Sequence, residues 1–286
     1  MSLYIALDMG GTKITAAAAD GDLRILRRVR GEATPVRLAE GLALLHRMVG
    51  ELAAGEKIAG IGAAAGGPLD WRNGVVSPLH QAEWREVPLR AIMQERWGCP
   101  FHVDVDTNVA ALGEHRFSPG KIRRLLYLTL STGMGGGYVV DGRLFRGMDD
   151  QHPEVGHQAV PFRCAHLERV ICACGAKGCL EALVSGRGIE RIYGRPARDL
   201  SAEMWAEVGH NLGQGLRNLA TILLPDEIVL GGGVAIGGGA RLLDAACAVM
   251  RENWKIIPVM PKVRLSELGQ DTPLMGALVI ARDGLE

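Results

Sequence analysis

The sequence predicts a duplicated α/β fold, and two observations lead to this prediction. First, one pattern occurs twice, near residues 3–29 and again near 124–145: strand, glycine-rich turn with threonine, strand, Asp-Gly turn, strand. Second, the remaining segments alternate between strand-like and helix-like spacing of apolar residues. A repeated unit of this kind indicates two related halves whose glycine turns face one another.

Composition argues against several classes of function. The chain has 286 residues, with 32 basic and 32 acidic residues and a formal net charge of zero. We therefore expect no nucleic-acid partner on electrostatic grounds. The start, MSLYIALDMGG, has no signal-peptide pattern, and we expect no apolar run long enough to span a bilayer. Cysteines clustered in a metal-like pattern without a secretory signal predict a cytoplasmic protein.

The N-terminal segment is predicted to form three strands, at residues 3–7, 14–19 and 23–29. The turn between the first two reads DMGGTK and contains Gly10, Gly11, Thr12 and Lys13. Such a turn presents backbone N–H groups and a hydroxyl to an anion, usually a phosphate, although a plain glycine hairpin is the alternative. Because a strand follows the turn, a dinucleotide-binding fingerprint is disfavoured, and the Walker spacing is absent.

The middle of the chain contains a candidate catalytic carboxylate. The expected elements are a helix over 35–54, a strand over 58–65, a helix over 89–97 and a strand over 101–105. Asp106 follows the last strand and begins a helix, so it is either a helix cap or a general base aimed into a cleft. Gly67 lies in a turn that would allow a ligand to approach closely, or in a simple turn. His80 and Trp84, in an irregular stretch, either line a pocket or only pack that loop.

The second half repeats the opening pattern. Strands are expected at 124–130, 138–140 and 143–145, with a glycine-rich turn, STGMGGG, at 131–137. Further expected elements are helices at 186–193, 201–223, 242–253 and 271–281, and strands at 227–230 and 263–265. A third glycine cluster, Gly231 to Gly233, follows the strand at 227–230 and suits close approach of a base or ribose.

A cysteine motif between the two groups of helices predicts a zinc site. Cys172, Cys174 and Cys179 form C-x-C-G-x-x-G-C, and His157 lies upstream. Three thiols and one imidazole suit a closed tetrahedral site, which would be structural. Ordinary buried cysteines or a disulfide pair are the alternatives. Cys164 and His166 lie in the same stretch and could replace one ligand.

Together these motifs resemble the ROK family of sugar kinases and repressors, over nearly the whole chain. The matching segments are DMGGTK at 8–13, DTNVAALGE at 106–114, STGMGGG at 131–137, EVGH at 154–157, CACGAKGCLE at 172–181 and GGGV at 231–234. The resemblance implies an actin-like ATPase (ribonuclease H-like) fold, duplicated, with two lobes around a deep cleft. It places a smaller α/β lobe at 1–106, with a C-terminal helix at about 272–286 packing back on it, and a larger lobe with the zinc loop at 107–271.

The resemblance also implies an activity and roles for single residues. The activity is ATP-dependent phosphorylation of a hexose or hexosamine with Mg²⁺, often by a homodimer. Asp106 would be the general base, and Asp8 would contact Mg²⁺, through water. The residues implied for phosphate are Gly10, Gly11, Thr12, Lys13, Thr132, Gly133 and Gly135, with Gly231, Gly232 and Gly233 near the adenosine. Those implied for the sugar, besides Asp106, are Gly67, His80, Glu154, His157 and Glu181. Those implied for zinc are His157, Cys172, Cys174 and Cys179.

The sequence departs from the family pattern at three places. Val105 stands where the family usually has Asn before the catalytic Asp, so a sugar contact is lost and the identity of the sugar is open. His80 occupies a position where Asn is common. The segment between His157 and Cys172 is longer than in many members.

Three other functions compete with a sugar kinase. A repressor would need a helix-turn-helix domain before the first strand, where we expect no room, and neutral charge disfavours DNA binding. A non-catalytic sugar-binding or regulatory protein on a kinase scaffold gains some weight from Val105. A metalloenzyme is disfavoured because Cys₃His leaves zinc no open position.

Glucose is the first expectation for the sugar, with fructose, mannose and N-acetylhexosamines next.

Overall fold

A computed structural model describes residues 2–79, 81–255 and 258–285. His80, a candidate sugar contact, lies outside the described residues. The chain divides into two compact units, residues 1–117 with 271–286, and residues 118–270. The boundary falls later than the expected one at Asp106, because the helix that starts there packs against the C-terminal helix within the first unit.

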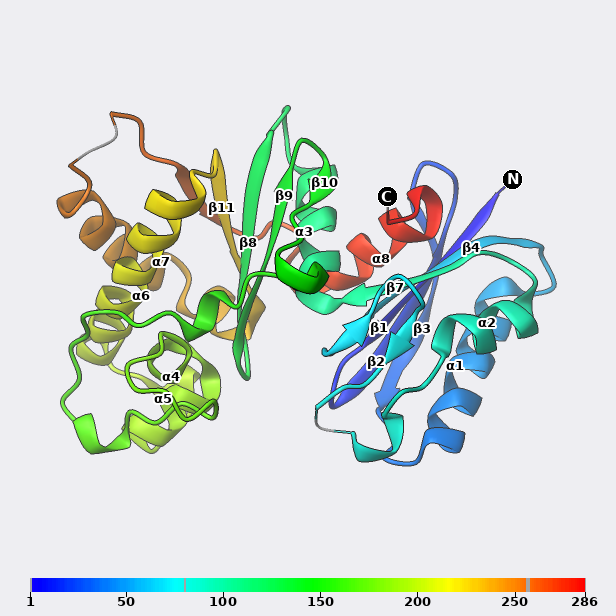
Figure 1. Ribbon diagram of the computed structural model, residues 1–286, viewed down its shortest axis with the longest axis horizontal. Helices are drawn as coiled ribbons and strands as arrows, with labels where there is room; N and C mark the ends of the chain where they lie inside the picture. Colours follow the sequence, from blue (N-terminus) through cyan, green and yellow to red (C-terminus); the bar gives the residue numbers. More distant parts are fainter. Residues whose placement is uncertain (1, 80, 256–257, 286) are drawn as a thin grey trace. The chain divides into compact units, whose positions relative to one another are not determined.

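The first unit contains a mixed sheet in the order β3-β2-β1-β4-β7 (Figure 1). Its strands are β1 (Leu3–Met9), β2 (Lys13–Ala19), β3 (Ile25–Ala33), β4 (Ile58–Ala65) and β7 (Phe101–Val105). Strands β1, β4 and β7 are parallel, β2 pairs antiparallel with β1, and β3 pairs antiparallel with β2. Helices α1 (Leu38–Ala53) and α2 (Leu89–Trp97) share one apolar cluster with the sheet, and α3 (Asp106–Phe117) and α8 (Thr272–Asp283) share the other.

Small residues let α8 approach the sheet and α3 closely. A Cβ at Gly60 would lie 2.2 Å from the carbonyl oxygen of Ala281, and one at Gly62 would lie 2.0 Å from that of Ala277. On the other side of α8, a Cβ at Gly276 would lie 1.8 Å from the carbonyl oxygen of Val109 in α3. The sequence IAGIGAAA of β4 therefore specifies a helix packed almost directly on the strand backbone.

We expect Gly276→Ala to destabilise the protein by about 2 kcal/mol or more, because backbone must move to make room for the new methyl group. The matched control is Gly237→Ala, also in a helix, where a Cβ would meet nothing within 4 Å. This control should be neutral or stabilising by up to about 1 kcal/mol, since alanine favours the helix. Urea unfolding of both variants measures the difference, and equal stabilities would contradict the close packing of α3 and α8.

The second unit contains a sheet in the order β10-β9-β8-β11-β12. Its strands are β8 (Arg124–Leu130), β9 (Met134–Val140), β10 (Arg143–Leu144), β11 (Glu227–Gly231) and β12 (Lys262–Leu265). Its α-helices are α4 (Glu181–Val184), α5 (Gly186–Tyr193), α6 (Ala202–Leu223) and α7 (Gly232–Glu252). One apolar core joins these helices to β8, β9 and β11. In both units, antiparallel strands precede parallel ones in the same order, which confirms the predicted duplication.

The remaining elements are short. They are β5 (Leu69–Asp70), β6 (Val75–Val76) and the 3₁₀ helices η1 (Ala82–Trp84), η2 (Met148–Asp150), η3 (Val155–His157), η4 (Leu167–Arg169), η5 (Ala197–Asp199) and η6 (Gly269–Asp271). Strands β5 and β6 pair as a small hairpin in a region expected to be irregular.

Glycines account for the two largest differences from the sequence prediction. Strand β9 begins at Met134 rather than Tyr138, so Gly135 to Gly137 lie in the strand and not in a turn. At Gly136, a Cβ would lie 2.8 Å from the Val155 side chain, so the strand needs glycine for close contact. Helix α7 spans Gly232–Glu252 but is kinked at Gly239, where the backbone is not helical (φ 56°, ψ −141°). The segment after the kink is close to the helix predicted at 242–253, whereas the glycine-rich segment before it was not predicted, because glycine is a poor helix former.

Helix α7 is an exception to the expectation that no apolar segment is long enough to span a membrane. By length and composition alone it could cross a membrane, and among the described residues it is the one helix that meets this criterion. In the structure, however, α7 packs on α6, where Gly209 and Gly213 let the two helices approach closely. A buried stripe including Leu242, Ala246 and Met250 belongs to the core of the second unit.

Candidate functional site

The glycine turn between β1 and β2 has the form of an anion-binding loop. Gly10 donates its N–H to the carbonyl of Lys13 (3.0 Å), which closes the turn. Thr34 holds the turn from β3's end, because its hydroxyl donates to the carbonyl of Gly10 (2.6 Å) and its N–H to that of Thr12 (3.1 Å). Among the described residues, the N–H groups of Gly11 and Thr12 have no acceptor. Two adjacent exposed N–H groups can therefore bind a phosphate oxygen. The contribution of Thr34 was not predicted.

Asp8 and Asp106 lie at the same edge of the first sheet. Asp8 is level with Ala64 of β4, which is level with Asp104 of β7, and Asp106 follows that strand at the start of α3. Burial and the carboxylate of Asp106 raise the pKa of Asp8 to about 7, while a hydrogen bond from Thr15 (3.5 Å) opposes this. Two carboxylates that disfavour each other's charge at this edge form a site that a divalent cation would stabilise.

Asp106 is partly buried, and its Oδ1 accepts the N–H of Thr107 (2.7 Å). Asp104 is fully buried and accepts hydrogen bonds from the N–H of Val105 (2.7 Å) and from Asn108 Nδ2 (3.2 Å), which fixes the backbone on both sides of Asp106. A Cβ at Gly67 would lie 3.6 Å from Val105, so Gly67 borders the same strand end. Val105 itself is buried.

The turn between β8 and β9 repeats the arrangement of the first turn. Ser131 donates to the carbonyl of Gly133 (2.9 Å), and the start of α5 holds the turn, with Gly186 donating to Ser131 (2.7 Å) and Arg187 to Thr132 (3.1 Å). The N–H groups of Thr132 and Gly133 have no acceptor in the part of the chain that the structure describes. Both units thus present a turn whose carbonyls are satisfied and whose N–H groups are open.

The third glycine cluster lies beside this second turn. Gly231 ends β11 and is level with Thr129 of β8. Gly232 has a positive φ of 86°, and a Cβ there would lie 2.4 Å from the carbonyl oxygen of Leu130. Glycine is therefore required at Gly232, and the N-terminus of α7 lies next to the turn, where its partial positive charge favours an anion.

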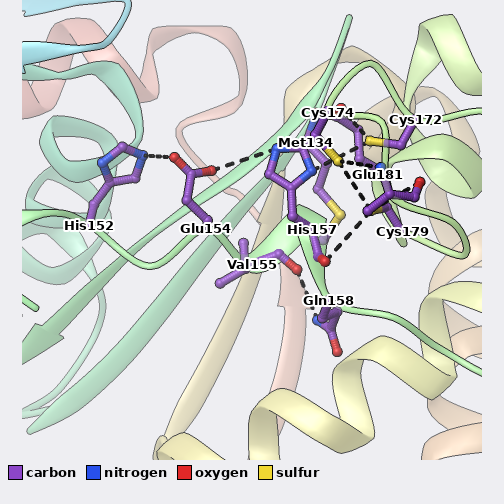
Figure 2. A network of polar contacts seen from close by, with 11 residues as sticks. Met134, His152, Glu154, Val155, His157, Gln158, Cys172, Cys174, Cys179 and Glu181 are labelled. Carbon is purple, nitrogen blue, oxygen red and sulfur yellow. Dashed lines mark hydrogen bonds and ion pairs between the residues drawn. The ribbon is translucent and has the colours of Figure 1, made fainter. Parts of the chain in front are cut away.

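The predicted metal ligands converge on one point. The ligand atoms of His157, Cys172, Cys174 and Cys179 all lie within 4.8 Å of one another. His157 Nδ1 is 3.5 Å from Cys172 Sγ, and the sulfurs of Cys174 and Cys179 are 3.6 Å apart (Figure 2). Tetrahedral zinc with Zn–S bonds of about 2.3 Å requires sulfurs about 3.8 Å apart, so the donor set fits zinc.

The structure does not contain the disulfide that is one alternative for these cysteines. All six cysteines are free, and a disulfide would need sulfurs about 2 Å apart. Cys164 and His166 do not belong to the ligand group, and the sulfur of Cys164 instead accepts the N–H of His166 (3.4 Å). Burial raises the pKa of Cys179 to about 12, so its thiolate needs a cation to form at neutral pH.

The carboxylates that flank the cysteine motif occupy different places. Glu154 is exposed, and its carboxylate lies 3.9 Å from Nε2 of His157 and 3.7 Å from Nε2 of His152 (Figure 2). Nε2 is the ring nitrogen of His157 that faces away from the sulfurs. Glu181 is partly buried, and its Oε2 accepts the N–H of Met134 (3.0 Å). Glu154 and Glu181 were both expected to contact the sugar, but in the structure they have different partners.

Comparison with known proteins identifies the class of this fold. The crystal structure of a ROK hexokinase from Thermus thermophilus is 34% identical, with a TM-score of 0.82 over 98% of this chain and 97% of that chain. That of a ROK family glucokinase from Streptomyces griseus with glucose and AMPPNP is 28% identical, with a TM-score of 0.80 over 99% and 100%. An N-acetylmannosamine kinase from Citrobacter koseri is 31% identical over 97% of this chain and 98% of the relative. The fold is that of the actin-like ATPases, as expected.

The family follows from a match along almost the whole chain. The family model described as ROK family covers residues 4–284. The chain therefore belongs to the ROK family, which confirms the resemblance seen in the sequence motifs. The relatives named above are sugar kinases with different substrates.

Proposed function

We propose that this protein is an ATP-dependent sugar kinase that transfers the γ-phosphate of ATP to a hydroxyl of a hexose, with glucose as the first expectation. The carrying observation is that each unit has a glycine turn with two adjacent open N–H groups. One turn holds Gly11 and Thr12, and the other holds Thr132 and Gly133. A nucleoside triphosphate has several phosphates for such turns to bind. Lys13, Gly10 and Gly135 adjoin them, and Gly231 to Gly233 would lie by the adenosine.

Asp106 is the proposed general base. Its carboxylate would accept the proton of the sugar hydroxyl as that oxygen bonds to the γ-phosphorus and the bond from phosphorus to the ADP oxygen breaks. A carboxylate suffices because phosphoryl transfer depends mainly on positioning and charge stabilisation. Mg²⁺, when bound, would neutralise charge on the β- and γ-phosphates, and Asp8 is its proposed partner through water.

The proposed sugar contacts come from both units of the chain. They are Gly67, His80, Asp106, Glu154, His157 and Glu181. His157 would use Nδ1 for zinc and Nε2 for the sugar or Glu154, as metal-bound histidines commonly use their second nitrogen for an oriented hydrogen bond. Zinc would be structural, because four protein ligands leave no position for substrate. Val105 presents methyl groups where Asn is usual, so it would influence which sugar is accepted.

We further propose that the protein acts in the cytoplasm as a homodimer. The deciding experiment measures ADP formation with Mg²⁺-ATP against a panel of hexoses and N-acetylhexosamines, each with a no-sugar control. We expect one sugar to exceed the others by about tenfold or more in kcat/KM. A flat panel, from protein shown to bind both ATP and zinc, would overturn the kinase proposal in favour of a non-catalytic sugar-binding protein.

A further inference from the structure

Glu181 lies between the metal loop and the glycine turn of the second unit. Its Oε2 accepts the N–H of Met134 (3.0 Å), and its Oε1 lies 3.8 Å from Cys172 Sγ (Figure 2). The same carboxylate limits the turn sterically, because a Cβ at Gly133 would lie 3.0 Å from Oε2. Each oxygen of Glu181 thus already has a neighbour within this unit, before any ligand binds.

The hydrogen bond to Met134 completes the set of contacts that shape the turn. The carbonyls of Ser131 and Thr132 are held by the start of α5, and Ser131 donates to Gly133. Met134 is the first residue of β9, directly after the turn, and it is buried. A buried N–H without an acceptor is costly, so Glu181 fixes the point where the turn ends. This leaves the N–H groups of Thr132 and Gly133 as the open donors.

The metal loop in turn fixes Glu181. Cys179 is two residues before it, and the carbonyl of Cys179 accepts the N–H of Ala182 (3.1 Å). Leu180 donates to the carbonyl of Gln158 (3.0 Å), which ties this segment to the residue after His157. A Cβ at Gly156 would lie 2.6 Å from the carbonyl of Met134 and 3.3 Å from Glu181 Cβ, so the loop rests directly on both residues.

We propose that Glu181 is a positioning residue for nucleotide binding: it holds the turn from Ser131 to Met134 in the form that presents its open N–H groups to phosphate. The proposal rests on the kinase function above and adds a second role to a residue otherwise assigned to the sugar. A contact to sugar alone gives no reason for Oε2 to accept a backbone N–H of the turn. A positioning role predicts that nucleotide affinity depends on Glu181 when no sugar is present.

The test measures binding of a non-hydrolysable ATP analogue with Mg²⁺, without sugar, by calorimetry on the zinc-loaded protein. Glu181→Ala should weaken binding about tenfold or more, the amount expected for loss of a charge-assisted hydrogen bond. Glu181→Gln, whose amide oxygen can still accept the Met134 N–H, should bind within about threefold of wild type. The matched control, Glu168→Gln, changes an exposed carboxylate in the segment between His157 and Cys172 and should bind the analogue as wild type does.

A second measurement reports on the turn without any nucleotide. Hydrogen exchange at the Met134 amide should be about tenfold faster in Glu181→Ala than in wild type or Glu181→Gln, with equal zinc content in all three. If Glu181→Ala does not fold, Glu181→Asp replaces it, because the shorter side chain keeps the charge but not the reach. Unchanged analogue binding and unchanged exchange in these variants would overturn the proposal, as would an equal loss in Glu168→Gln. Failure of the wild-type protein to bind the analogue would instead overturn the kinase function.

Discussion

Replacing Asp106 with asparagine is expected to lower kcat by about 10³-fold while leaving the protein folded. Asparagine keeps the shape of the side chain and the oxygen that accepts the Thr107 N–H. It removes the carboxylate that would take the proton of the sugar hydroxyl. Nucleotide and sugar affinity should change by less than about tenfold, because the lost interaction develops mainly in the transition state.

The stability of Asp106→Asn should differ from wild type by no more than about 1 kcal/mol, because two effects oppose each other. The charge of Asp106 favours the N-terminus of α3, where it lies in the first turn. The same charge disfavours ionised Asp8, whose pKa it raises. Asp22→Asn, an exposed carboxylate of the same unit, is the control and should keep full activity. Wild-type turnover in Asp106→Asn would contradict the assignment of the general base.

The strands and most helices follow from local sequence because their apolar patterns match what each element buries. Residues 3–7 and 124–130 are apolar runs that become central strands, and residues 35–54 carry the helical spacing that α1 buries. The segment of α7 before its kink at Gly239 could not be predicted, because Gly232 and Gly233 suggest a turn by propensity alone. Its actual start depends on a tertiary contact, the close approach of Gly232 to Leu130, which no local pattern reports.

The candidate site likewise has parts that the local sequence predicts and contacts that it does not predict. The cysteine motif could be predicted because three of its four ligands lie within eight positions, and their spacing alone suits a metal. The bond from Met134 to Glu181 could not, because the partners are 47 residues apart in sequence. Nor could the bond from Thr34 to Gly10, which joins residues 24 positions apart. Such contacts depend on how the units fold, and no motif signals them.

The metal site provides the second large expected effect. We expect purified wild-type protein to hold about one zinc per chain, and Cys179→Ser to hold less than about a tenth of that. Cys179 is buried, and its sulfur lies 3.6 Å from both Cys174 Sγ and the carbonyl oxygen of His157. The Cys179→Ser variant therefore lacks one of the four ligands of the group. Elemental analysis of unchelated protein measures the metal directly.

Cys164→Ser is the matched control, because Cys164 belongs to the same loop but not to the ligand group. It should keep the zinc content of wild type. Loss of zinc in Cys164→Ser with retention in Cys179→Ser would show that the ligand set is different. A wild-type protein without zinc would contradict the site altogether.

Loss of zinc should also weaken sugar binding by about tenfold or more, because the ligands position the proposed sugar contacts. His157 would lose the partner that orients its ring, and Glu181 follows Cys179 by two residues. The core of the second unit lies mainly outside this loop, so Cys179→Ser should unfold only about 5–10 °C lower than wild type. A structural site therefore predicts a folded protein with impaired sugar binding. Full sugar affinity in the zinc-free variant would separate the metal loop from the sugar site.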